Sequence, residues 1–232
     1  MSTIDERPTR SRPGGPPPGI RTFHVRHGRV SARHEDALAR LGPGFGVPAG
    51  GDPSAAFDRG APLVLEIGSG MGDATAAMAA ADPGRNYLAV EVHTPGVANL
   101  LSLIEERGLT NVRVAQLDAV ELVQSVPAGT LNAVHVFFPD PWPKARHHKR
   151  RLIQPTHVAL LRSRLVPGGI LHCATDWPEY AEAMLATLDA DPELVNTADG
   201  YAPRPTHRPL TKFEQRGIDA GRDIADLIFR RR

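Results

Sequence analysis

The sequence predicts one α/β domain built around a mostly parallel β-sheet. Short apolar runs alternate with helical segments from Ala61 to about residue 196. This alternation implies a parallel sheet with right-handed crossovers, and such sheets bind ligands at the carboxyl ends of their strands. The 232 residues suffice for one such domain and a short appendage. A content of 41% hydrophobic and 23% charged residues is ordinary for a soluble globular protein.

Two segments precede the predicted domain, which covers residues 61–232. Residues 1–20 are rich in Pro, Gly and Arg, so they cannot bury enough apolar surface to offset the entropy of ordering, and we expect a disordered tail. Residues 21–60 are expected to form an irregular lead-in with one short helix over 31–41. A serine begins that helix, and Gly42-Pro43 ends it.

Within the domain, strands are expected where short apolar runs end at turn residues, at 62–68, 86–92, 111–116, 131–138 and 170–176. Helices are expected between and after them, at 73–81, 95–107, 119–124, 153–165 and 177–188. The segment 206–232 is expected to form a loop and a helix, followed by a last edge strand at 224–229.

Composition excludes several classes of protein. The single cysteine, Cys173, rules out a disulfide within the chain and a cysteine-based zinc site. No apolar run approaches the ~20 residues that span a bilayer. The N-terminus lacks the apolar core of a secretory signal, so we expect a cytoplasmic protein. Net charge is only +1, so any affinity for nucleic acid must come from a local cluster of basic residues.

A glycine-rich loop follows the first predicted strand and reads Glu66-Ile67-Gly68-Ser69-Gly70-Met71-Gly72-Asp73. A dinucleotide loop would place a third glycine where Asp73 stands, and an acid there would repel a pyrophosphate at the helix N-terminus. The loop therefore favours a cofactor without phosphate, such as the sulfonium cation S-adenosylmethionine. Two more acids follow predicted strands: Glu91, placed for ribose hydroxyls, and Asp118, near the adenine. Taken singly, each is as well explained as a helix cap or a surface acid.

The segment 137–152 (FFPDPWPKARHHKRRL) holds one carboxylate, Asp140, between two prolines, followed by Trp142 and a third proline. The prolines predict a stiff loop rather than a helix. Five of the eight residues from Lys144 to Arg151, called here the basic block, are Lys or Arg. A fixed acid beside dense positive charge suits a nucleobase held by its edge with its phosphates neutralised alongside. A solvated charge run or a localisation signal would not need the rigid acidic lead-in.

Five motifs, EIGSGMGD, EVHTPGV, PDPWPKARHHKRRL, TDWPEYAE and RPLTKFEQRG, run in order from about Glu66 to Phe229. Together they resemble the bacterial tRNA (guanine-N7)-methyltransferase family. The resemblance implies a Rossmann-like class I methyltransferase fold over 61–232, with a mostly parallel doubly wound sheet and an antiparallel C-terminal edge strand. It also implies methyl transfer from S-adenosylmethionine to N7 of guanine-46 in the tRNA variable loop.

The resemblance also assigns roles to residues that match the family's motifs. The cofactor site comprises the strand-end acids and the loop glycines: Glu66, Gly68, Gly70, Gly72, Glu91, Asp118 and Asp140, with Asp140 also at the catalytic position. The substrate-binding residues are Lys144, Asp176 and the run Thr211, Lys212, Phe213 and Glu214. The RNA-contacting block is Arg146, His147, His148, Lys149, Arg150 and Arg151.

Other interpretations of the residues stay open at this point. Trp142 and Trp177 stack on a base or simply pack, and Thr211 with Glu214 also fits a helix capping box. His147 and His148 are interpreted as phosphate neighbours, and no metal site is expected. The expected partner is tRNA, without a membrane, and the protein is a monomer or a homodimer. The rival functions are a methyltransferase for another nucleobase, a protein or a small molecule, and a non-catalytic RNA-binding scaffold. An NAD-dependent oxidoreductase is disfavoured by Asp73.

Overall fold

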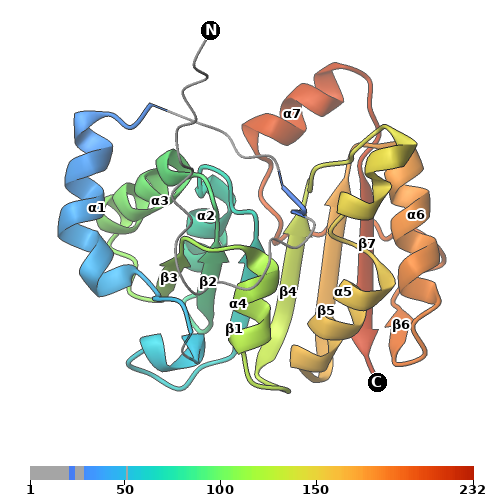
Figure 1. Ribbon diagram of the computed structural model, residues 1–232, viewed down its shortest axis with the longest axis horizontal. Coiled ribbons are helices and arrows are strands. Elements are labelled where there is room, and N and C mark those ends of the chain that lie inside the picture. The colour runs from blue at the N-terminus through green and yellow to red at the C-terminus, as the bar shows by residue number, and fades with distance from the viewer. Residues whose placement is uncertain (1–20, 24–28, 51) are drawn as a thin grey trace, which may run out of the picture.

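The structure, a computed structural model, describes residues 21–23, 29–50 and 52–232 (Figure 1). The tail predicted for residues 1–20 lies outside these described residues. A seven-stranded sheet runs through the molecule in the order β3-β2-β1-β4-β5-β7-β6. Five strands are mutually parallel: β1 Leu63–Ile67, β2 Asn86–Val90, β3 Val112–Ala115, β4 Leu131–Phe137 and β5 Leu165–Thr175. The predicted α/β fold class is confirmed.

Two further strands complete one side of the sheet. β7 (Ala225–Arg231) runs antiparallel to β5, and β6 (Leu194–Asn196) pairs antiparallel with β7. The predicted C-terminal strand is therefore antiparallel, as expected. It is not the edge strand of the sheet, because β6 pairs with its other side. With three residues, β6 is too short to give a sequence pattern that indicates a strand.

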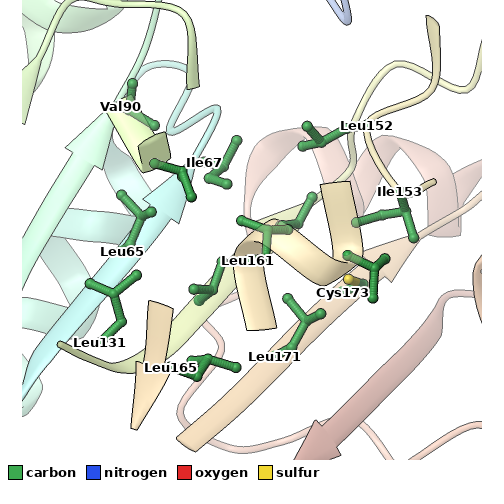
Figure 2. Close-up of a cluster of buried hydrophobic side chains, with 14 of the residues drawn as sticks. Leu65, Ile67, Val90, Leu131, Leu152, Ile153, Leu161, Leu165, Leu171 and Cys173 are labelled. Atoms are coloured by element: carbon green, nitrogen blue, oxygen red, sulfur yellow. The ribbon is translucent and has the colours of Figure 1, made fainter. Parts of the chain in front are cut away.

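Helices cover both faces of the sheet (Figure 1). One face carries α1 Ala32–Phe45, α2 Asp73–Ala81 and α3 Thr94–Arg107, and the other carries α4 Ala119–Ser125, α5 Pro155–Arg164 and α6 Pro178–Asp189. Alternate strand residues point to opposite faces, so Val64 packs under α2 and α3 while Leu65 joins the core under α4 and α5. Figure 2 shows part of this second core, where Leu65 lies among leucines of β4 and α5. Cys173 is buried in the same core, as a small apolar residue would be.

Two predicted boundaries were wrong. α1 begins after Ser31, whose side chain accepts a hydrogen bond from the His34 amide, but it continues through Gly42 and Pro43 to Phe45. Its packing along α3, with an Arg40–Glu105 ion pair of 2.7 Å, outweighs the local stop signal. α5 ends at Arg164, and β5 begins at Leu165 before the Pro-Gly-Gly sequence. Leu165 pairs with Leu131, and the register then shifts, so Ile170 pairs with Ala133.

The remaining helical segments are short. The 3₁₀ helix η1 (Pro53–Ala56) lies in the lead-in, and η2 (Ala145–Arg150) forms within the basic block, where we predicted a loop. The last helix, α7 (Lys212–Asp219), precedes β7. Among the described residues, no helix is both long enough and apolar enough to cross a membrane.

Candidate active site

The carboxyl ends of β1, β2, β3 and β4 meet at one edge of the sheet. The strand order reverses between β1 and β4, because β2 and β3 lie on one side of β1 and β4 lies on the other. Ligands of open α/β sheets bind in the crevice outside such a switch point. Glu66, Glu91, Asp118 and Asp140 all lie at or just past these four strand ends. The topology therefore brings the predicted cofactor acids to one edge.

The glycine loop after β1 depends on backbone conformations that favour glycine. Gly68, Gly70 and Gly72 have φ angles of 75°, 57° and 81°. A Cβ on Gly72 would lie 2.6 Å from the Cβ of Leu100 in α3. A Cβ on Gly96, at the start of α3, would lie 2.1 Å from the carbonyl oxygen of Gly70. Gly96 is thus needed for α3 to approach the loop, a requirement that the sequence analysis missed.

Glu91 holds the glycine loop against the end of β2. Its Oε2 accepts a hydrogen bond from the Gly70 amide at 2.8 Å, and its Oε1 accepts from the amides of Val92 and His93 at 2.7 and 2.8 Å. A carboxylate has about four lone-pair positions, so about one is left for a further donor. Glu91 therefore positions the loop, and the predicted ribose contact stays a prediction limited to about one hydrogen bond.

Glu66 is buried at the end of β1, next to Glu91. Its Oε2 accepts a hydrogen bond from the Thr75 hydroxyl of α2 at 2.5 Å. Burial, with a smaller contribution from the Glu91 charge, raises the pKa of Glu66 to about 7, although the Thr75 hydrogen bond acts in the opposite direction. A cation placed nearby would favour the ionised form of Glu66. The carboxyl is therefore suited to respond to a positively charged ligand.

Asp118 caps α4, as the alternative interpretation held. Its Oδ1 accepts a hydrogen bond from the Val120 amide at 2.8 Å, and the residue is half-buried after β3. This cap fixes the carboxylate at the same edge as Glu66 and Glu91. The predicted contact with an adenine stays a prediction.

Two observations indicate that the glycine loop could hold a small cofactor. The Ser69 hydroxyl is buried without a hydrogen-bond partner in the described part of the chain. A Cβ built on Gly68 or Gly70 would meet no described atom within 4 Å, so the loop backbone is open to close approach. Together with Glu66, these features leave polar groups and free space for a ligand that carries positive charge rather than phosphate.

Asp140 follows β4 in a loop with two unusual backbone conformations. Phe138 and Trp142 have φ angles of 51° and 46°, in the left-handed region that non-glycine residues rarely adopt. The Phe138 amide donates to the Ala174 carbonyl at 2.8 Å, so pairing with β5 continues up to the loop. Strain of this kind persists where the surroundings over-determine it, and it clusters at functional sites. The segment 139–143 (PDPWP), called here the PDPWP loop, thus presents Asp140 in a fixed place.

Trp142 packs inside this region rather than offering an open ring. It is 3% exposed, and its indole N–H donates to the Thr22 carbonyl at 3.2 Å. The Arg150 guanidinium lies 3.8 Å from the ring centroid, a cation–π contact. Arg150 also donates to the Arg21 carbonyl at 3.1 Å. The packing interpretation of Trp142 is therefore confirmed, and the tryptophan orients part of the basic block.

The basic block divides into anchoring and exposed residues. Arg151 is 4% exposed, and its guanidinium donates to the Pro141 carbonyl at 2.9 Å and to both Glu179 oxygens. These contacts join the PDPWP loop to α6, so Arg151 serves the scaffold. Lys144, Arg146 and Lys149 are exposed. The predicted RNA contact is best supported for these three exposed cations, with His147 and His148 half-buried beside them.

The substrate residues predicted near the C-terminus surround α7. Asp176 follows β5, and its Oδ2 pairs with the Arg222 guanidinium at 2.9 Å. The Thr211 hydroxyl caps α7 by accepting from the Glu214 amide at 3.1 Å. This is half of the capping box, because the Glu214 carboxylate is buried and accepts hydrogen bonds from Arg204 and Arg208 instead. The substrate roles of Thr211 and Glu214 stay predictions, and the observed contacts of both residues position α7.

A buried ionic network under α7 was missed by the sequence analysis. Arg208 is 1% exposed and donates to Glu214 at 2.7 Å and to both oxygens of Asp226 at 2.9 and 2.8 Å. Asp226 also accepts from His172 at 2.7 Å. The members of the network lie on β5, β7, α7 and the segment before α7, so no local pattern could indicate them. The network fixes α7 to the sheet beside Asp176.

Comparison with known proteins shows the family of this chain. A protein-family model described as "Putative methyltransferase" matches residues 60–227. Proteins named tRNA (guanine-N(7)-)-methyltransferase from Aromatoleum aromaticum and Nitrosospira multiformis are both 56% identical over 217 residues. The match spans 92% of this chain and 84% and 95% of theirs. The protein of the same name from Paraburkholderia xenovorans is 57% identical, over 92% of this chain and 84% of its own.

Solved structures agree on the fold. The 16S rRNA methyltransferase KamB superposes with a TM-score of 0.51 at 17% identity, covering 75% of this chain and 88% of its own. The [4+2]-cyclase SpnF also gives a TM-score of 0.51, at 18% identity, covering 85% and 79%. At these identities the likeness shows the class I methyltransferase fold alone. The extent and identity of the sequence matches go further, and by them this chain belongs to the bacterial tRNA (guanine-N7)-methyltransferase family.

Proposed function

We propose that this enzyme transfers the methyl group of S-adenosylmethionine to N7 of guanine-46 in the variable loop of tRNA. The observation that carries the proposal is the meeting of two features at one sheet edge. Glu66 ends β1 before the glycine loop, and Glu91 follows β2 and holds that loop. The strained loop with Asp140 follows β4, which pairs with β1. The names of the relatives supply the substrate class, tRNA guanine N7.

The glycine loop, Glu66 and Ser69 would hold the cofactor. The loop backbone allows close approach, and the carboxylates favour a cation with an amine. When bound, S-adenosylmethionine supplies an electrophilic methyl group on a sulfonium. Glu91 keeps the Gly70 amide in place, and Asp118 lies at the adjacent strand end. These residues bind and orient the cofactor, and none of them needs to transfer a proton during methyl transfer.

The chemistry at the acceptor requires alignment more than base catalysis. N7 of guanine has an exposed lone pair and no proton to lose, so the protein must place N7 in line with the methyl group and tolerate charge that moves onto the purine. Asp140 and Asp176 follow β4 and β5, two paired strands. We assign one or both to accept hydrogen bonds from the guanine N1–H and N2 amine, which adenine does not offer in that pattern.

The basic block would position the tRNA backbone. Lys144, Arg146 and Lys149 are exposed on and beside η2, directly after the loop that presents Asp140. Phosphate contacts fix register without reading sequence, whereas base contacts specify. The exposed cations would therefore supply affinity, and the two aspartates would supply the choice of guanine.

The test is methyl transfer to unmodified bulk tRNA with labelled S-adenosylmethionine, followed by nucleoside analysis. We expect 7-methylguanosine, and its loss when guanine-46 is replaced by adenine in a single tRNA transcript. A different methylated nucleoside would overturn the assignment of N7. Cofactor binding without transfer to tRNA would favour another acceptor, and the absence of cofactor binding would favour a non-catalytic RNA-binding scaffold.

A further inference from the structure

Three histidines from distant parts of the sequence meet under the segment that leads into α7. His135 lies on β4, His172 lies beside it in register on β5, and His207 lies in the segment before α7. The ring centroids form a nearly equilateral triangle, with separations of 5.8, 6.0 and 5.7 Å. One ring nitrogen from each histidine lies within 4.8 Å of the others. Such convergence of imidazoles is the arrangement that a metal ion requires.

Two of these rings carry buried nitrogens that lack a partner. His135 and His172 are 6% and 1% exposed, and the Nδ1 atom of each makes no hydrogen bond to the described residues. Buried polar atoms in native proteins are nearly always satisfied by protein, water or an ion. A purely apolar packing role would be served better by Phe or Leu. The unpartnered nitrogens therefore point to a ligand.

A hydrogen bond to Asp226 favours the tautomer of His172 that can bind a metal through Nδ1. Asp226 accepts from His172 Nε2 at 2.7 Å, which leaves His172 Nδ1 with its lone pair free. A carboxylate behind a ligating imidazole is the usual second partner of a metal-binding histidine.

We propose that His135, His172 and His207 bind one divalent transition-metal ion of the zinc type. Neutral imidazoles suit Zn²⁺, Co²⁺, Ni²⁺ or Cu²⁺, whereas Mg²⁺ and Ca²⁺ prefer oxygen ligands. Tetrahedral Zn–N bonds place ligand nitrogens about 3.3 Å apart, so the rings close in on binding. His207 is exposed on a loop and can make that movement. Its open side leaves the fourth position to water.

The charges around the site permit a cation. Arg208 lies nearby, but its charge is compensated by the carboxylates of Glu214 and Asp226, which it contacts directly. The bound ion would tie β4 and β5 to the segment before α7. The Phe137 ring packs 5.0 Å from His135 and 4.8 Å from His172, one residue before the strained Phe138. The site therefore lies directly below the loop that presents Asp140, and we assign it a structural role.

The test uses the full chain without an affinity tag, stripped with a chelator and dialysed against ZnCl₂, CoCl₂ or MgCl₂. We expect one Zn²⁺ or Co²⁺ per chain, the visible bands of tetrahedral Co²⁺, a raised melting temperature, and no uptake of Mg²⁺. His207→Ala removes an exposed ligand that the fold does not need, and it should weaken Zn²⁺ binding at least about tenfold. His135→Gln, which keeps a polar side chain in the buried position, should do the same.

The matched control is His34→Gln, a histidine on α1, which packs along α3; this variant should bind Zn²⁺ as the wild type does. A second control, His147→Ala with His148→Ala, separates this cluster from the histidine pair of the basic block. The proposal is overturned if His207→Ala and wild type take up the same metal with the same affinity. It is equally overturned if the second control loses the ion, or if Co²⁺ binds without tetrahedral bands.

Discussion

The two sides of the candidate site hold their charged residues in different ways. On the cofactor side, Glu91 and Asp118 are fixed by backbone amides, most of them within a few residues in the sequence. On the substrate side, Arg151 and Glu214 are fixed by side chains and carbonyls from other elements. The acids of the cofactor side are thus held mainly by hydrogen bonds to backbone amides near them in the sequence. The substrate side depends on the packing of α6, α7 and the PDPWP loop.

This difference changes how a charged motif should be interpreted. The basic block looks uniform in sequence, yet Arg150 and Arg151 anchor the loop while Lys144, Arg146 and Lys149 face solvent. A substitution in the first group should act on stability, and one in the second group on binding. The predictions below test this division, from the largest expected effect to the smallest.

Asp140→Asn should have the largest effect, because it removes a carboxylate at the reacting edge while leaving the loop prolines in place. We expect the single-turnover rate of methyl transfer to fall at least about 100-fold. The affinity for tRNA should change less than about threefold, because phosphate contacts supply most of it. Rapid-quench transfer and filter binding measure the two quantities. Equal losses in rate and in tRNA affinity would make Asp140 a docking residue.

Glu66→Gln should stabilise the protein without cofactor and weaken cofactor binding. A carboxyl whose pKa rises on folding, here from 4.5 to about 7, contributes its stability below its ordinary pKa and loses it as pH rises through 7. The variant should therefore gain up to about 3 kcal/mol over wild type at pH 8, and little near pH 4.5. Urea unfolding at pH 5 and pH 8 checks this difference.

The same carboxyl predicts how cofactor affinity depends on pH. If the cation of S-adenosylmethionine favours ionised Glu66, binding releases protons and tightens as pH rises from 6 to 8. Glu66→Gln should abolish that pH dependence, as calorimetry at three pH values would show. An unchanged slope in the variant would place the responsible group elsewhere.

Arg151→Ala should destabilise the fold by about 2 kcal/mol. It removes the paired hydrogen bonds to Glu179 and the contact with the Pro141 carbonyl, although the exposure of Glu179 limits the loss. Lys149→Ala, in the same block but exposed, is the matched control and should stay within about 0.5 kcal/mol of wild type. Chemical unfolding of both variants decides the point. Similar stabilities would remove the distinction between anchoring and exposed residues.

Lys149→Ala should show the smallest effect. It removes one phosphate contact, so the slope of log affinity for tRNA against log salt should fall by at most about one. Affinity should decrease similarly for different tRNAs, since phosphates carry no sequence information. A variant with altered preference among tRNAs but an unchanged salt slope would contradict this role.

The sequence predicts those parts of the molecule that local patterns determine. The five central strands, α2 and the strand-end acids follow from short-range periodicity and glycine placement. It does not predict the role of Gly96, which matters only because α3 contacts the carbonyl of Gly70. It also does not predict the Arg208 network or the cluster of three histidines, because their members come from separate elements. Long-range contacts of this kind leave no spacing signal, and packing also overrode the stop signal at Pro43.

The most direct test of the division between the two sides is to measure two dissociation constants on each of two variants. We predict that Glu66→Gln weakens the binding of S-adenosylmethionine and leaves tRNA binding unchanged. We predict that Lys149→Ala weakens the binding of tRNA and leaves cofactor binding unchanged. If either variant weakens both ligands to the same extent, the two sides are not separate, and the account is contradicted.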